Sequence, residues 1–127
     1  MKAFVLVAVG GALGTLSRYG IAEALADGHL FPVATFLVNI TGSFLLSALL
    51  GTLILRGETS TSGHTSRLLL GTGFLGGYTT YSALAVETET LLRGDHLVLG
   101  LTYALGSVVA GLVAALTGIA VARTVAR

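Results

Sequence analysis

Four long stretches without charged side chains constrain what this 127-residue chain can fold into. The first runs from Ala3 to Ala22 and is interrupted by one charge, at Arg18. The later stretches cover 28–55, 68–86 and 96–122. Because about 20 mostly apolar residues cross the hydrocarbon core as a helix, the pattern predicts an all-α integral membrane protein with four spans, at about 3–23, 33–55, 68–92 and 97–121.

The composition agrees with membrane residence. Hydrophobic residues make up 54% of the chain and charged residues only 10%, whereas soluble domains carry about 25% charged residues. The connections between the spans are short, so we expect a single membrane domain covering 1–127. A net charge of +1 gives no nucleic-acid surface, and the absence of cysteine excludes disulfides and thiolate sites.

The distribution of basic residues predicts an orientation. An even number of spans places both termini and the middle loop on one side of the membrane. That side carries five basic residues and the other side carries two, which favours termini in the cytoplasm of a prokaryotic cell. The five are Lys2, Arg56, Arg67, Arg123 and Arg127, and the two are Arg18 and Arg93.

The third stretch is a poor continuous helix. Its glycines, at positions 71, 73, 76 and 77, lead into Tyr78-Thr79-Thr80-Tyr81-Ser82. Irregular backbone at membrane depth is tolerated only inside protein or beside a wet cavity, where its polar groups can meet ions. We therefore predict a break in this span, and the positive ring edges and hydroxyls beside it would suit a small anion. The alternative is that the glycines only permit tight helix crossing.

A few polar side chains interrupt the other spans. Asn39 must find hydrogen-bond partners, either by tying helices together or by donating an N–H to an anion. Tyr103 and Ser107 share one helix face. Arg18 either extends to the interface or attracts anions at an aqueous vestibule. Glu87 is expected at the membrane interface, with a pore mouth as the alternative.

Small residues recur at spacings that permit close helix packing. Gly10 and Gly14 form one such pair, Gly73 and Gly77 another, and Ser43, Ser47 and Gly51 share a helix face. These residues serve either association between subunits or packing within one subunit. Since four spans are few for enclosing a path, we expect a twofold dimer.

Three segments resemble the fluoride channel family known as Fluc or CrcB, in order and over nearly the whole chain. Gly10-Gly11-Ala12-Leu13-Gly14 with Ser17-Arg18-Tyr19 looks like the opening of that family. The stretch from Pro32 through Val38-Asn39 to Gly42-Ser43-Phe44 looks like its second span. The stretch from Gly73 to Ser82 looks like its third-span break, which is the most specific of the three motifs.

The resemblance implies a fluoride channel that is a dual-topology dimer, with two subunits antiparallel in the membrane. It implies a structural sodium ion held by backbone carbonyls, which map to Gly76 and Thr79. It also implies a vestibule role for Arg18. The residues it implies for the fluoride pore are Asn39, Tyr81, Ser82, Tyr103 and Ser107.

The chain departs from the family pattern at two aromatic positions. Tyr81 and Leu84 stand where the family usually has phenylalanine. Some family members pair with an unlike subunit, so the partner is either a second copy or a paralogue. The expected function is passive fluoride export, without enzymatic activity. A proton-coupled multidrug exporter, which would need a carboxylate within the first span, and a non-transporting scaffold subunit are the alternatives.

Overall fold

The computed structural model describes residues 1–26, 28–57 and 59–126, and within these ranges all regular structure is helical. The helices are α1 (Lys2–Ala24), α2 (Val33–Leu55), α3 (Thr61–Ser66), η1 (Arg67–Leu75), α4 (Gly76–Tyr78), α5 (Tyr81–Arg93) and α6 (Leu97–Val125). Among the described residues, α1, α2 and α6 are long and apolar enough to cross a membrane. They match three of the predicted spans, with α6 continuing beyond the predicted end at 121.

The third segment differs most from the sequence expectation. It begins at Thr61, in the connection between the predicted spans 33–55 and 68–92, because Ser60 caps α3 by accepting a hydrogen bond from the Gly63 N–H. The segment then continues through the π-helical η1 into α4. Helical backbone stops at Thr79 and Thr80 and resumes with α5. The third predicted span is thus built from consecutive shorter helices.

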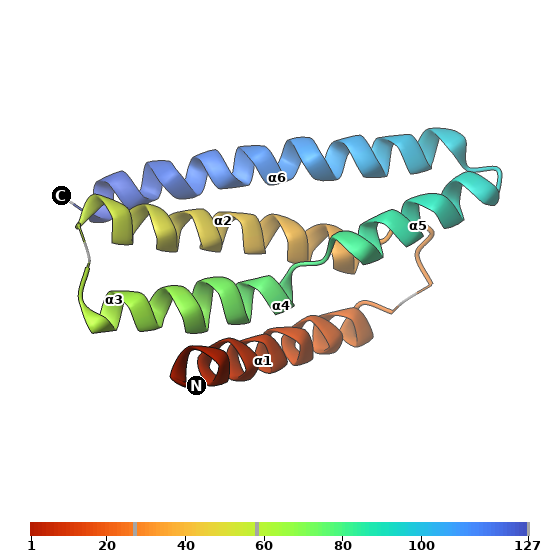
Figure 1. Ribbon diagram of the computed structural model, residues 1–127. Coiled ribbons are helices and arrows are strands. Elements are labelled where there is room, and N and C mark those ends of the chain that lie inside the picture. The colour runs from red at the N-terminus through yellow and green to blue at the C-terminus, as the bar shows by residue number, and fades with distance from the viewer. Residues whose placement is uncertain (27, 58, 127) are drawn as a thin grey trace.

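The helices form two closely packed pairs (Figure 1). α1 packs along η1 and α4, while α2 packs along α6 over most of its length. α5 leaves the line of α4 and packs against α6, so the interruption redirects the chain from the first pair to the second. Both ends of the chain lie at the same end of the bundle (Figure 1), as an even number of crossings requires. Which side of the membrane they occupy stays a prediction.

The small residues serve packing within the subunit. A Cβ atom added to Gly10 or Gly14 would collide with the backbone of η1, at the carbonyl oxygens of Leu69 and Phe74. Gly77 approaches the Gly11 backbone just as closely. The second helix pair is packed in the same way. A Cβ atom added to Gly118 of α6 would collide with the Ser47 side chain and the backbone of α2. These pairs therefore pack helices within one subunit, which is the alternative to association between subunits.

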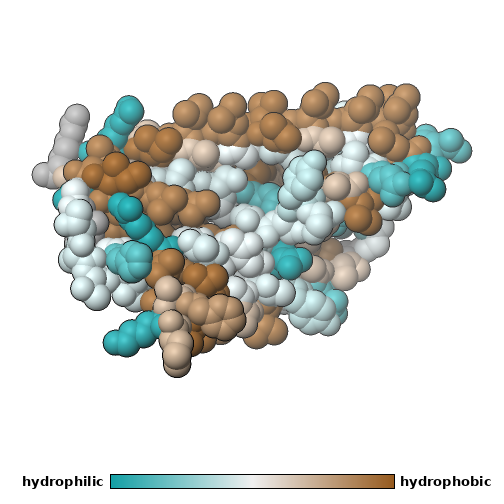
Figure 2. Space-filling view, in the orientation of Figure 1, coloured by the Kyte–Doolittle hydropathy of each residue, from teal (hydrophilic) through white to brown (hydrophobic). Residues whose placement is uncertain are grey.

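A single subunit buries little of itself. In the described chain only five hydrophobic side chains are buried: Val38, Leu75, Leu91, Tyr103 and Ala122. Large apolar side chains cover the outer face of α6, which Figure 2 shows as a continuous hydrophobic band. Exposed apolar surface of this extent is stable only against lipid or another subunit. The chain is thus a multi-pass membrane protein, with its apolar faces turned outward.

Candidate functional site at the interrupted third segment

The interruption is held by the side chain of Asn39. Thr79 and Thr80 adopt extended backbone, with ψ values of 158° and 122°. The Asn39 amide nitrogen donates to the Thr80 carbonyl at 2.9 Å, and the Thr80 N–H donates to the Asn39 carbonyl oxygen at 2.8 Å. The amide thus pairs with both polar groups of one residue, in the manner of a neighbouring strand. One of its two N–H donors has no partner among the described residues.

The break also leaves two carbonyl oxygens without their usual donors. In a continuous helix the carbonyl of Gly76 would accept from the Thr80 N–H, four residues on. That N–H is directed to Asn39 instead. The carbonyl of Thr79 would accept from the Ala83 N–H, which donates to the Thr80 hydroxyl at 3.1 Å. No hydrogen bond from the described residues reaches either carbonyl.

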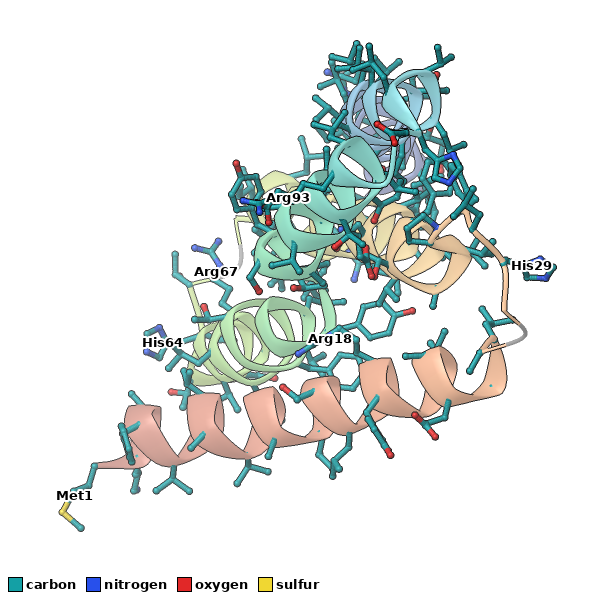
Figure 3. The ribbon with its side chains drawn as sticks, turned by 90° about the vertical axis from the view of Figure 1, so that its right-hand side faces the viewer. Met1, Arg18, His29, His64, Arg67 and Arg93 are labelled. Atoms are coloured by element: carbon teal, nitrogen blue, oxygen red, sulfur yellow. The ribbon has the colours of Figure 1, made fainter. Side chains whose placement is uncertain are left out.

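One of the two carbonyls between them, that of Gly77, is held from the other side by α1. The Arg18 Nε donates to it at 3.2 Å, and the Thr15 hydroxyl donates to it at 3.4 Å. Figure 3 shows Arg18 extending from α1 toward the third segment. The ion pair between Arg93 and Glu89 is the only one in the described chain, so Arg18 carries its charge without a carboxylate partner there.

A groove of about 260 Å³ lies beside the break. It brings together Asn39 and Tyr81, which were predicted for the fluoride pore, and Thr79, which was predicted as a sodium ligand. Their roles stay predictions. Tyr81 is 82% exposed. Ser82 is outside the residues that line the groove, but its hydroxyl lies 3.2 Å from that of Thr80, which does line it. The lining residues are Asn39, Gly42, Ser43, Leu46, Thr79, Thr80, Tyr81 and Leu84.

Tyr103 lies outside this groove, in a cluster centred on Glu87. Its side chain is fully buried, and its hydroxyl donates to one Glu87 carboxylate oxygen at 2.5 Å. The Thr35 hydroxyl donates to the other oxygen at 2.8 Å. Glu87 therefore joins α5 to both α2 and α6. Glu87 is conspicuous in the sequence because it directly follows an uncharged stretch. The sequence does not show that its partners are Thr35 and Tyr103.

Ser107 connects the cluster with the groove along α6. It is 6% exposed, and its hydroxyl has no hydrogen-bond partner in the described structure. A Cβ at Gly111, one turn further, would contact the Ser43 hydroxyl, so these two positions face one another. Asn39 precedes Ser43 by one turn on α2, and the two helices run in parallel. This register places Ser107 at the level of Asn39.

The electrostatic character of the site comes from neutral dipoles. The described residues contain no group of three or more His, Cys, Asp or Glu side chains that could hold a metal ion. Carbonyl oxygens suit hard cations such as sodium, and hydroxyl and amide donors suit small anions. The Gly76 and Thr79 carbonyls supply the first kind of group, and Asn39 and Ser82 supply the second.

Known proteins share this sequence over most of its length. Residues 5–119 match the model of the family described as CrcB-like protein, Camphor Resistance (CrcB). The chain is 47% identical to a fluoride-specific ion channel FluC from a strain of Thermus thermophilus, over 93% of each chain. It is 40% identical to a fluoride-specific ion channel FluC from Novosphingobium aromaticivorans, over 99% of this chain and 100% of the relative.

A third relative, a fluoride-specific ion channel FluC 2 from Leifsonia xyli, is 42% identical over 94% of this chain and 82% of its own length. The family match covers most of α1 and α6, all of α2 and the whole interrupted segment. The chain belongs to the CrcB-like family.

Proposed function

We propose that the protein is a fluoride-selective channel that lets fluoride leave the cytoplasm down its gradient and so relieves its toxicity. The observation that carries the proposal is the groove beside the break, where hydrogen-bond donors and an exposed aromatic ring meet at an interrupted helix. The identity of the anion is inferred from the bacterial relatives, which are named fluoride-specific ion channels. A channel of this kind carries out no chemical reaction, so no enzymatic activity is expected.

Fluoride is small and strongly hydrated, so a pore must replace its water with donors. Asn39 offers its second amide N–H, because only one of the two donates to the Thr80 carbonyl. The Ser82 hydroxyl and the positive ring edge of Tyr81 complete the donors near the groove. The buried hydroxyl of Ser107 lies at the same level, and Tyr103 continues the polar face of α6 toward Glu87. Arg18 raises the local anion concentration from the α1 side.

The sodium ion of the proposal is structural and is held by the carbonyls of Gly76 and Thr79. Both have lost the N–H groups that would otherwise pair with them, which supports their availability to a cation. Two carbonyls are too few to replace the hydration shell of sodium. A second subunit related by a twofold axis would double the number of ligands, so the ion site belongs at a dimer axis.

The proposed assembly is therefore an antiparallel dual-topology dimer with the interrupted segment at mid-membrane. The small core of the single subunit and the exposure of Tyr81 support a partner at this face. The partner is a second copy or a paralogous subunit. Leu84 lines the groove and offers no aromatic ring edge to an anion. A paralogous subunit with phenylalanine at this position would supply the missing ring.

Fluoride efflux from liposomes tests the function. Purified protein is reconstituted alone, with internal potassium fluoride, valinomycin to balance the charge and a fluoride electrode outside, in media with and without sodium. We expect rapid efflux that requires protein and is supported by sodium. The absence of efflux from folded protein, both alone and with a paralogue, would contradict the channel and favour a scaffold role. Fluoride efflux that needs an opposing proton gradient would favour an exporter, for which α1 supplies no carboxylate before Glu23.

A further inference from the structure

The carbonyl of Gly77 stands apart from the others that the break releases. The carbonyls of Gly76 and Thr79 remain open, while that of Gly77 receives Arg18 and Thr15 from α1. Both donors belong to one face of α1, one helical turn apart in the sequence. α1 therefore withdraws the Gly77 carbonyl from the site, whereas Asn39 and the Thr80 hydroxyl leave the Gly76 and Thr79 carbonyls open by taking their N–H donors.

The backbone at this point needs an external anchor. Gly76 and Gly77 are consecutive residues without Cβ atoms, so their φ and ψ angles are less restricted than those of other residue types. A larger residue at position 77 is excluded, because its Cβ would collide with the carbonyl oxygen of Gly11. On the N-terminal side, the Gly76 N–H donates to carbonyls of η1, those of Gly71 and Gly73. On the C-terminal side, the hydrogen bonds to the Gly77 carbonyl come from Arg18 and Thr15.

We infer that Arg18 and Thr15 are positioning residues that fix the Gly77 carbonyl and thereby hold the Gly76 carbonyl in the orientation that binds a cation. The inference rests on the proposed function, because the cation is the proposed sodium ion. Peptide groups are planar, so the Gly77 peptide turns as one unit with its carbonyl. Fixing that carbonyl restricts rotation at Gly77 and limits the rotation available to the Gly76 carbonyl before it.

Two effects of Arg18 on a cation have opposite signs. Its uncompensated positive charge repels a cation bound nearby. Its hydrogen bond to the Gly77 carbonyl supports cation binding by fixing the backbone. Substitutions that conserve charge isolate the second effect. Arg18→Lys keeps the charge but loses the Nε donor and the planar guanidinium, and Thr15→Val removes a hydroxyl without changing shape or charge.

Thermal unfolding of the purified dimer in detergent provides the test without relying on conduction. Sodium replaces N-methylglucamine at constant ionic strength, and the sodium concentration that gives half of the maximal stabilisation is recorded. We expect each variant to raise this concentration on the order of fivefold relative to wild type. Ser17→Ala is the matched control, because the Ser17 hydroxyl donates to the Leu13 carbonyl of its own helix.

The outcomes separate the inference from the proposed function. Efflux from wild-type liposomes tests the channel by itself. If wild-type protein conducts fluoride and is stabilised by sodium, unchanged or tighter sodium binding in both variants overturns the positioning role. If sodium stabilises no form of a conducting protein, the inference is overturned as well. Thr15→Val, which alters an exposed position, decides the result if Arg18→Lys does not fold.

Discussion

Replacing Asn39 tests the contact that holds the break. Asn39→Ala removes both hydrogen bonds to Thr80 and leaves a part-buried N–H and C=O without partners. Each lost bond contributes about 0.5–1.5 kcal/mol, and a stranded polar group costs about 1–3 kcal/mol. Since water in the groove can partly replace the lost partners of these part-buried groups, the expected loss of unfolding free energy is about 2–4 kcal/mol. Asn39→Asp retains the acceptor and loses the donor, so it should fall between Ala and wild type in stability.

Urea unfolding in mixed micelles, followed by helical circular dichroism, measures this loss, and liposome efflux measures its effect on conduction. Thr52→Val on the same helix is the control, because the Thr52 hydroxyl donates only to the Ala48 carbonyl of α2. We expect efflux to fall at least tenfold in both Asn39 variants and to stay unchanged in the control. An Asn39→Ala protein with wild-type stability and wild-type efflux would refute the role of Asn39 in the break.

Two further substitutions test the packing around the site. Gly14→Ala places a methyl group against the Phe74 carbonyl and should lower the unfolding free energy by about 1–3 kcal/mol. Gly20→Ala, with no atom within 4 Å of the new Cβ, should be neutral. Equal unfolding free energies for the two variants would contradict the close packing of α1. Tyr103→Phe leaves one Glu87 oxygen without its donor and should lower the unfolding free energy by about 1–3 kcal/mol in the same unfolding assay. An unchanged unfolding free energy would mean that water, and not Tyr103, satisfies the carboxylate.

Hydropathy and charge predicted the long helices closely. The spans at 3–23 and 33–55 were placed within a residue of α1 and α2, because uncharged length is set by the bilayer and is visible in the sequence. The start of the third segment was placed too late. The polar residues from Thr61 to Ser66 carry no apolar signal, and their helix depends on the Ser60 cap and on continuity with η1.

Residue types at the site were also predictable, whereas their pairings were not. A buried amide in α2 had to find a partner, but nothing local indicated the backbone of Thr80, which is 41 residues away. Gly10 and Gly14 signalled close packing without naming the surface they meet. Tyr103 was expected in the pore with Asn39, which stays a prediction; nothing local indicated its hydrogen bond to Glu87 outside the groove. Such pairings depend on how the helices cross, which spacing along one helix does not encode.

The charge balance of fluoride movement tests the central proposal most directly. Liposomes containing the purified protein are loaded with potassium fluoride, and efflux into a fluoride-free medium that contains sodium is recorded with and without the potassium carrier valinomycin. A parallel set is loaded with chloride. The account predicts fast fluoride efflux only when valinomycin balances the charge, and little chloride efflux under the same conditions. Fluoride efflux that is independent of valinomycin, or equal rates for the two anions, would contradict a passive fluoride-selective channel.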